Sequence, residues 1–478
     1  MVDPTMVKRA MIKRASLLLL VAGLAACTSM GPDYQRPAME LPVAWNAAPG
    51  DAASAAGEPW WRVFRDPQLD ALVEEALKRN ANVAIAVARL DEARAQLRST
   101  DAERFPAVTA GFDRARQQNS IATATSFPGI RREYNDTRAA LNVSYELDLW
   151  GRLARAGEAA RAELLATEAA GNTVRLSLAS QVSQSWFALR ALDAQIEATR
   201  RVLGLREQTH ALQRKRLDGG LIAELDLRQV EADVAAARAQ LPGLEREREA
   251  QTGALSVLVG RTPRAVMEGG FERAVQADAN AARELVVPSG LPSELLLRRP
   301  DLVESEQKLI AANARIGAAR AALFPTISLT GTLGSQSMAL SDLFSGPAGL
   351  WRFVASVSQP IWQAGRLQAQ EQVILARQRQ AQAGYELAIQ TAFREVRDAL
   401  AAQVAARERA SALADRARAL SQSLRLAKLR YDNGVSSQLE VLDAERALLA
   451  AETDRIDALR AQRAAIADLF KALGGGWG

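Results

Sequence analysis

One sequence pattern occurs twice at a constant offset, and it limits the folds that this chain can adopt. Gly151-Arg152-Leu153 recurs as Gly365-Arg366-Leu367, and Arg216-Leu217-Asp218-Gly219-Gly220 recurs as Arg430-Tyr431-Asp432-Asn433-Gly434. Between these two motifs each copy has no proline and is rich in Ala, Leu, Arg, Glu and Gln, which are strong helix formers. The chain is therefore an internal duplication, and each copy contains one very long helix.

The two long helices are expected at 152–217 and 366–431, and each would be about 100 Å long. An ordinary globular core does not need such a rod, so the helices pack sideways against similar rods or bridge two places. Each copy also has a shorter helix before the long one and a return helix after it, at 81–104 with 221–259 and at 300–323 with 435–473. The summed length of each short pair matches one long helix, which predicts that the two short helices stack end to end.

Four segments alternate between apolar and polar residues, as strands do. They lie near 107–116, 138–150, 326–336 and 351–362. Strands of this length with one apolar and one polar face fit the wall of a transmembrane barrel with a wet lumen. A half-buried soluble sheet is the usual alternative, but nothing else in this chain could cover the apolar face. Four strands cannot close a barrel, and open edges are not tolerated in lipid, so several subunits must complete it.

The first residues read as a targeting segment. Lys13-Arg14 precede a short apolar run that ends in Leu24-Ala25-Ala26-Cys27, and Cys27 is the only cysteine of the chain. This run is too short to span a bilayer, and the true start could be Met1, Met6 or Met11. Residues 1–26 carry four basic residues and one acidic residue, so their removal lowers the net charge from +5 to +2. Since the remaining Arg residues alternate with acids along helices, we expect no nucleic-acid partner.

The chain offers no constellation for catalysis. His210 is the only histidine and reads as an ordinary residue of a long helix, and there is no zinc spacing, phosphate loop or nucleophile motif. We therefore expect no enzyme activity, no cofactor and no metal. The aromatic cluster from Trp60 to Phe64 is expected to pack in a core, with a membrane-interface anchor as the alternative.

Several motifs together resemble the outer-membrane channel of tripartite efflux pumps, in its lipoprotein branch (OprM- and CmeC-like, also called the NodT branch, related to TolC). They are Leu24-Ala25-Ala26-Cys27, the stretch at 32–37, Trp60 to Pro67, Gly290-Leu291-Pro292-Ser293, Arg298 to Leu302, Ile316 to Ala321, and Phe324 to Gly331. The resemblance implies a mostly α fold with a transmembrane β-barrel part: a homotrimer with one shared twelve-stranded barrel and a long α-helical barrel. It also implies that Cys27 is lipidated and that the protein lies in the outer membrane and extends into the periplasm.

In functional terms the resemblance implies a passive exit duct for small molecules such as drugs, with outer-membrane lipid around it. Its partners would be a periplasmic adaptor (membrane fusion) protein and an inner-membrane pump of the resistance-nodulation-division (RND) type. Two other functions stay open. An outlet for protein secretion would have the same fold, although that branch lacks the lipobox. A periplasmic coiled-coil structural lipoprotein is the other class, although an adaptor-like chain should show a flanking β-rich domain. The cargo and the particular pump are not encoded in this chain.

The same resemblance divides the chain into segments. These are a lipoprotein signal peptide at 1–26, a lipidated linker at 27–59, an equatorial segment at 60–80, a first efflux repeat at 81–260, an equatorial linker at 261–294, a second efflux repeat at 295–474 and a tail at 475–478.

The turns after the long helices are the candidate functional tips. By resemblance they contact the adaptor and close the duct at rest, through Gly219, Gly220, Leu221, Asn433, Gly434 and Val435. Asp226, Glu440 and Asp443 align with family positions that face a periplasmic gate, where three-fold symmetry would make rings of acids that suit cations. Acids in the first turn of a helix are also favoured by its dipole, and for Asp226 that explanation is equally good. Arg216, Arg430 and Tyr431 are candidates for a lock of the closed state.

Overall fold

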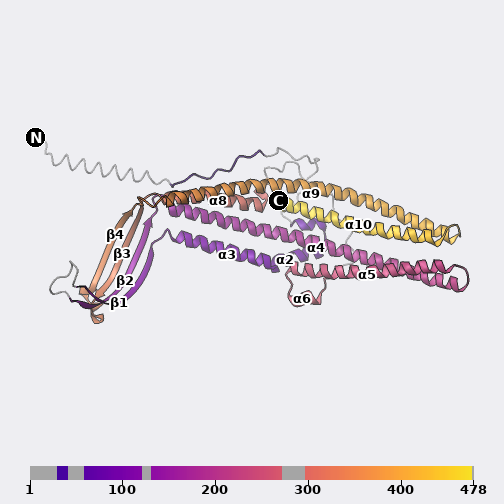
Figure 1. Ribbon diagram of the computed structural model, residues 1–478, viewed down its shortest axis with the longest axis horizontal. Helices are drawn as coiled ribbons and strands as arrows, with labels where there is room; N and C mark the ends of the chain where they lie inside the picture. Colours follow the sequence, from indigo (N-terminus) through magenta and orange to yellow (C-terminus); the bar gives the residue numbers. More distant parts are fainter. Residues whose placement is uncertain (1–28, 41–58, 121–130, 272–296, 476–478) are drawn as a thin grey trace. The chain divides into compact units, whose positions relative to one another are not determined.

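The computed structural model describes residues 29–40, 59–120, 131–271 and 297–475. The same element order occurs twice along the chain (Figure 1). The first copy has α3 (Ala81–Ala102), β1 (Ala107–Gln118), β2 (Glu133–Leu147), α4 (Arg152–Asp218) and α5 (Glu224–Val259). The second has α8 (Pro300–Ala321), β3 (Thr326–Ser337), β4 (Gly349–Ser358), α9 (Arg366–Asp432) and α10 (Gln438–Ala472). The duplication of a helix-strand-strand-helix-helix unit is confirmed.

The two long helices, α4 and α9, have 67 residues each. Gly151 and Gly365 stand directly before them with φ of 75° and 80°, a conformation that glycine adopts without steric cost. Both helices agree with the expected ranges to within one residue. None of the described helices has an apolar stretch long enough to cross a bilayer.

The chain forms two compact units, and each is described by itself. The first unit comprises the described parts of 1–38, 90–167 and 304–385, and it holds the sheet. The second comprises the described parts of 39–89, 168–303 and 386–478, and it holds the two helical hairpins and a small core. Both units draw residues from both copies of the repeat.

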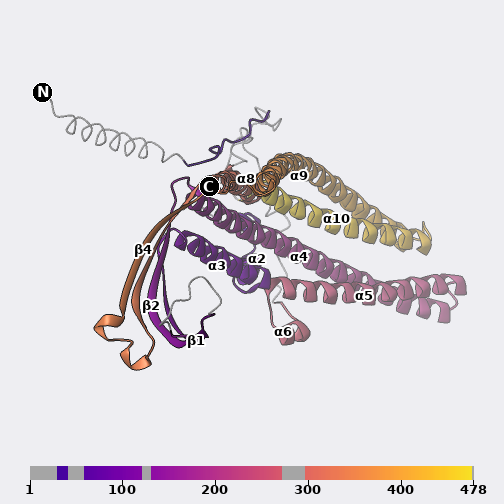
Figure 2. The ribbon, with the colours of Figure 1, turned by 60° about the vertical axis from the view of Figure 1, so that its left-hand side comes forward.

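The sheet of the first unit has four antiparallel strands in the order β1-β2-β3-β4, and Figure 2 shows it as curved. Two of its limits differ from those expected. Strand β2 begins at Glu133 and not near 138, because polar residues from Glu133 onward still pair with the end of β1. It ends at Leu147 and not at 150, because Asp148 Oδ2 accepts a hydrogen bond from the Ala154 amide at 2.7 Å and so begins helix α4.

Strand β4 lies at Gly349–Ser358 and not at 351–362. Its early end has a physical reason: Pro360 has no amide hydrogen to donate to a strand partner. The side chain of Gln359 instead donates to the Leu323 carbonyl at 3.1 Å. The expected helix ends at 104 and 323 are two residues too late, since residues 103–105 and 322–324 form turns before the prolines.

The core of the second unit gathers around the aromatic cluster. The 3-10 helix η1 (Trp60–Phe64) and α2 (Pro67–Arg79) pack on residues of α4 and α10. Trp60 stacks on Phe470 with ring centroids 5.3 Å apart, and Phe64 meets Phe187 edge-on at 4.7 Å. Trp60 and Phe64 are buried, so the prediction of core packing is confirmed.

Two equivalent junctions stack the short helices end to end in the second unit. At the first, Asn80 precedes α3 and its Nδ2 donates to the Leu258 carbonyl at the end of α5 at 2.8 Å. At the second, Arg299 precedes α8 and its Nη1 donates to the Ala472 carbonyl at the end of α10 at 2.8 Å. The two helix ends are followed by Gly260 and Gly474, both with positive φ and both in close contact with the backbone before the next helix. The expected end-to-end stacking is therefore present in both copies.

Candidate functional sites on the sheet and at the helical tips

One face of the sheet is apolar across all four strands. The residues of one row stand opposite one another in register: Ala110, Leu141, Leu333 and Trp351. A neighbouring row holds Val108, Val143, Gly331 and Phe353. The large side chains here are exposed, Trp351 by 79% and Phe353 by 66%. A water-soluble sheet would bury such a face, so this one needs an apolar environment outside the chain.

The opposite face of the same sheet is polar. Thr109, Asn142, Thr332 and Arg352 form one row, in which Thr332 Oγ1 donates to Asn142 Oδ1 at 2.9 Å. Asp113 stands opposite Arg138 on this face. On β2 the apolar positions run from Ala139 to Leu147, close to the 9–11 residues that a tilted strand needs to cross a bilayer. The sheet thus has the two faces of a barrel wall between lipid and water.

The first described residues lie on the helices of this unit as an extended segment, 29–36. The Met30 amide donates to the Trp150 carbonyl at 3.1 Å, where β2 turns into α4. Asn313 Nδ2 donates to the Pro32 carbonyl at 2.9 Å, and Arg36 makes two hydrogen bonds of 2.7 Å to Glu306. Burial and the Glu306 carboxylate raise the pKa of the Tyr34 phenol, which donates to Glu306 at 3.1 Å. Cys27 itself lies outside the described residues.

The tips of both helical hairpins, at the ends of α4–α5 and α9–α10 in Figure 1, share one backbone geometry. The Leu221 amide donates to the Arg216 carbonyl at 2.8 Å, and the Val435 amide donates to the Arg430 carbonyl at 2.9 Å. Gly220 and Gly434 supply the positive φ that this helix-ending motif requires. The motif leaves Leu221 and Val435 exposed by 76% and 66%. The residues after each long helix belong to this motif, so α5 and α10 begin at 224 and 438, three residues later than expected.

Two of the three lock candidates belong to one contact between the hairpins. Arg216 Nη1 donates to the Tyr431 hydroxyl at 2.6 Å, and Gln213 Nε2 donates to the same oxygen at 2.8 Å. Gln213 is buried, whereas Arg216 and Tyr431 are half-buried, so the contact is only partly shielded from solvent. The third candidate, Arg430, lies 3.5 Å from the Glu440 carboxylate in an exposed pair.

The three gate candidates differ in their surroundings. Asp226 Oδ2 accepts from the Ala223 amide at 3.3 Å and so caps α5. Glu440 and Asp443 are exposed on α10, and Asp443 lies 3.2 Å from Arg446. Glu440 and Asp443 lie in the first turns of α10, close in sequence to the tip where Tyr431 ends α9. The Asp226 side chain instead caps its own helix, α5.

Sequence reasoning missed a buried charged contact above the tips. Asp233 of α5 is 4% exposed, and its Oδ1 accepts from Arg446 Nη2 of α10 at 2.7 Å. The Asp233 carbonyl accepts from Arg206 Nη1 at 3.0 Å, and all three residues line a cavity of about 680 Å³. A signal was present, because Asp233 lies next to Val234 and three residues after Val230 on the apolar stripe of the helix.

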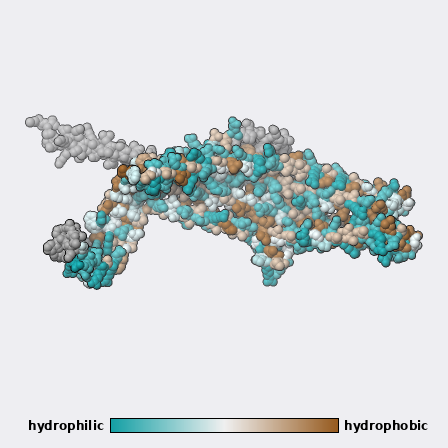
Figure 3. Space-filling view, viewed as in Figure 1, coloured by the Kyte–Doolittle hydropathy of each residue, from teal (hydrophilic) through white to brown (hydrophobic). Residues whose placement is uncertain are grey.

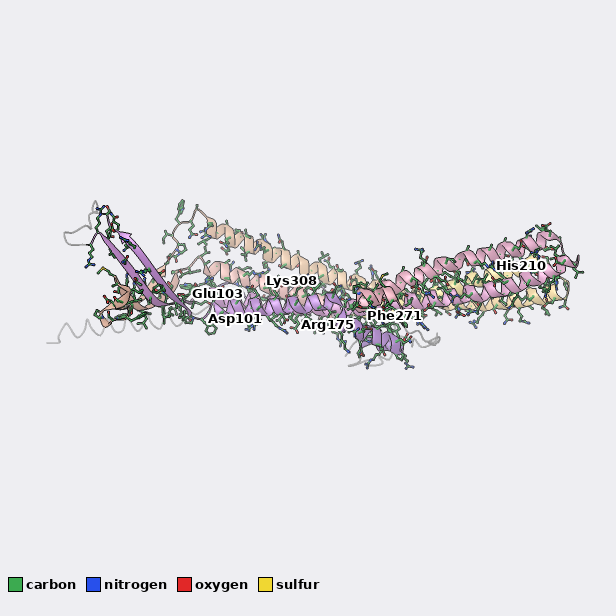
Figure 4. The ribbon with its side chains drawn as sticks, turned by 90° about the horizontal axis from the view of Figure 1, so that it is seen from below. Asp101, Glu103, Arg175, His210, Phe271 and Lys308 are labelled. Atoms are coloured by element: carbon green, nitrogen blue, oxygen red, sulfur yellow. The ribbon has the colours of Figure 1, made fainter. Side chains whose placement is uncertain are left out.

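His210 lies on α4 in the half that ends at the tip (Figure 4), with its Nε2 3.4 Å from Glu231. Hydrogen bonds from Arg228 and then from His210 lower the pKa of the Glu231 carboxyl. Within the described ranges there is no group of three or more histidine, cysteine or acidic residues that could hold a metal ion.

Comparisons with known proteins agree with this geometry. The family model for outer membrane efflux proteins matches residues 72–261 and 291–475. The cation efflux system protein CusC of Escherichia coli O6:H1 is 36% identical over 95% of this chain and 96% of its own length. The antibiotic efflux pump outer membrane protein ArpC of Pseudomonas putida is 36% identical over 98% and 96%. The crystal structure of the Campylobacter jejuni CmeC outer membrane channel superposes with a TM-score of 0.86 at 25% identity, covering 94% of this chain and 95% of that one.

Proposed function

Because this chain belongs to the outer membrane efflux protein family, we propose that three copies of it assemble into one duct through the outer membrane. The protein is the passive outer-membrane exit duct of a tripartite efflux system, and it exports small molecules. The observation that carries the trimer is the open four-stranded sheet with one apolar and one polar face. Three such sheets make a wall of twelve strands, with the polar faces lining the passage.

Heat-modified migration of the purified protein on a gel tests the trimeric barrel. A barrel that resists detergent should run faster before boiling than after it, and crosslinking should stop at three copies. A chain that migrates alike before and after boiling would contradict the barrel and favour a structural coiled-coil lipoprotein.

The duct does not determine its cargo by itself. CusC and ArpC carry names that specify cations and antibiotics, yet both are 36% identical to this chain over nearly its whole length. Selection therefore belongs to the partners, an adaptor in the periplasm and an inner-membrane pump of the resistance-nodulation-division type. The adaptor would contact the exposed tips at Gly219, Gly220, Leu221, Asn433, Gly434 and Val435. Changing both Leu221 and Val435 to Asp should abolish capture of the adaptor, whereas Leu387→Asp, at an exposed site on α9, should not.

Cys27 would carry the acyl chains that hold the N-terminus in the inner leaflet of the outer membrane. The support is geometric: Ser29, two residues later, lies within contact distance of Gly151, at the turn between β2 and α4. An anchor that begins here starts at the edge of the apolar band of the sheet. The mass of the mature N-terminal peptide tests this, and an unmodified Cys27 would contradict it. We also propose the division into signal peptide, linkers and two efflux repeats, and the two ranges that the family model matches, 72–261 and 291–475, support the two repeats.

The periplasmic gate would be formed by rings of Glu440 and Asp443, with Asp226 contributing less because it caps its own helix. Arg216, Arg430 and Tyr431 would hold the tips together in the closed state. Conductance in planar bilayers tests the gate. The wild type should show a small, cation-selective conductance, and the change of Glu440 and Asp443 to Ala together should increase it.

The matched control changes Glu452 and Asp454 to Ala, which removes the same charge from α10 farther along the helix from the tip. The control should conduct like the wild type. If the variant with both gate changes also conducts like the wild type, the duct stands and these gate residues are wrong.

A further inference from the structure

The outward face of the sheet changes its chemistry along the first hairpin. Phe112, Ala139, Ser335 and Gly349 stand in one row. Past this row, the outward positions of β1 are Arg114, Arg116 and Gln118, because side chains alternate between the two faces. The opposite positions of β2 are Thr137, Asn135 and Glu133. The apolar face is thus followed at once by a basic rim, which we define as Arg114 and Arg116.

Both arginines of the basic rim are exposed. Arg116 Nη2 lies 3.2 Å from Glu133, and the two side chains remain 78% and 55% exposed. Arg114 makes no ion pair with any residue that the structure describes. One Glu133 for two guanidinium groups leaves the rim with an excess of positive charge.

The rim lies on the external side of the membrane. The strands join the helices at their other ends: β1 follows α3, and β2 leads into α4. Since the family's helices extend into the periplasm, the hairpin end of the sheet points to the outside. In Figure 3 this far end of the strands is hydrophilic, whereas lighter and brown colours follow the strands toward the helices.

The second hairpin lacks such a rim. At the corresponding outward positions it has Ser335 and Ser337 on β3 and Gly349 on β4. Other arginines of the sheet, Arg138 and Arg352, take inward positions in the polar rows. Within the sheet, guanidinium groups at outward positions are therefore confined to the first hairpin, β1–β2.

We propose that Arg114 and Arg116 bind the phosphate groups of lipid headgroups in the outer leaflet of the outer membrane. The apolar rows accept the acyl chains, and the rim begins two residues beyond Phe112, about 7 Å along the strand. That is where the headgroup of a lipid lying on this face would begin. A guanidinium group matches phosphate oxygens with two parallel hydrogen bonds, and the attraction is stronger beside an apolar surface than in open water. This proposal rests on the barrel of the proposed function, and it adds recognition of lipid headgroups to the contact with acyl chains.

The experiment measures lipid binding to the purified full-length trimer in a neutral detergent by native mass spectrometry. The probes are lipid A with its phosphate groups and dephosphorylated lipid A. The wild type should bind the phosphorylated form more tightly, and the difference should shrink as salt is raised. The variant R114Q/R116Q should bind phosphorylated lipid A about tenfold more weakly and the dephosphorylated form as the wild type does. R114K/R116K should recover part of the loss.

The matched control is R138Q/R352Q, which removes the same charge from the inward face of the same sheet. It should bind both probes like the wild type. Equal loss in R138Q/R352Q would overturn the proposal, because binding would then follow total charge and not the rim. Full displacement of lipid A by inorganic phosphate at the same concentration would also overturn it, since the site would then take free phosphate. If R114Q/R116Q does not form trimers, the wild type decides alone: equal affinity for the two lipids contradicts the proposal.

Discussion

The indole nitrogen of Trp186 donates a hydrogen bond of 2.8 Å to Asp66 Oδ2, deep in the core of the second unit. The other carboxylate oxygen of Asp66 accepts from the amides of Gln68 and Leu69 and so caps helix α2. Trp186 is fully buried. One carboxylate therefore joins the short helix that follows the linker to the long helix α4.

We expect Asp66→Ala to destabilise the protein by about 2–4 kcal/mol, because it removes a helix cap and leaves a buried indole donor without a partner. Asp66→Asn should cost less, since the amide oxygen can keep one of the two functions. Thermal unfolding of the purified protein measures both. Asp91→Ala is the control, because Asp91 forms an exposed pair with Arg94 and its loss should change stability by less than about 1 kcal/mol. Equal effects at Asp66 and Asp91 would contradict this role.

The two helix junctions predict unequal sensitivity in the two copies of the repeat. Arg299 is 6% exposed and contacts the Ala472 carbonyl, Asp301 and Glu395, with Nη2 at 2.6 Å and 2.8 Å from the two carboxylates. The uncharged Asn80 side chain makes two hydrogen bonds, to the Leu258 carbonyl and from the Asn82 amide at 2.7 Å. Arg299→Ala should therefore lower the free energy of unfolding by about 2–4 kcal/mol, and Asn80→Ala by about 1–2 kcal/mol. The loss at Arg299 is not larger because the carboxylates beside it are partly exposed and recover hydration. A larger cost at Asn80 in the same thermal assay would show that the charged junction is not the stronger one.

The contact between the N-terminal segment and α8 depends on the absence of a side chain at Gly317. A Cβ there would overlap the Met30 carbonyl oxygen and would lie 2.8 Å from Arg155 Cγ. Gly317→Ala should release residues 29–36 from the helices, and protease cleavage or hydrogen exchange within them should become faster. Gly384→Ala is the control, because a Cβ there meets nothing within 4 Å and alanine favours helix. Unchanged protection of residues 29–36 in Gly317→Ala would contradict the close contact.

The sequence predicted the architecture because its signals are local and repeated. Helix α4 is a proline-free run that ends at a glycine, and alternation in β2 follows directly from residues 139–147. The limits of β2 were predicted less well. Residues 133–137 are polar on both faces, so periodicity does not mark them as strand, and only their pairing with β1 does.

The contacts at the candidate site could not be predicted in the same way. Arg216 was predicted as a lock candidate without a named partner, and within the chain it donates a hydrogen bond to the Tyr431 hydroxyl, 215 residues away. Asp233 and Arg446 belong to different hairpins and meet only when α5 lies beside α10. The sequence around each of these residues does not reveal its partner, because the pairs depend on how the helices pack.

The Tyr431 hydroxyl leads to the last prediction, because it accepts hydrogen bonds from both Arg216 and Gln213. Tyr431→Phe keeps the ring, which lies 5.7 Å from the Arg216 guanidinium carbon, and removes only the oxygen. The buried Gln213 amide nitrogen then loses the Tyr431 oxygen and keeps its hydrogen bond to Gln438. The contact between the hairpins therefore weakens. If this contact holds the tips closed, single-channel recordings should show a larger open probability for Tyr431→Phe than for the wild type. Tyr145→Phe, on a strand far from the tips in sequence, should leave the open probability unchanged. A closed Tyr431→Phe channel that matches the wild type would remove Tyr431 from the lock and leave the exposed Arg430–Glu440 pair as its remaining candidate.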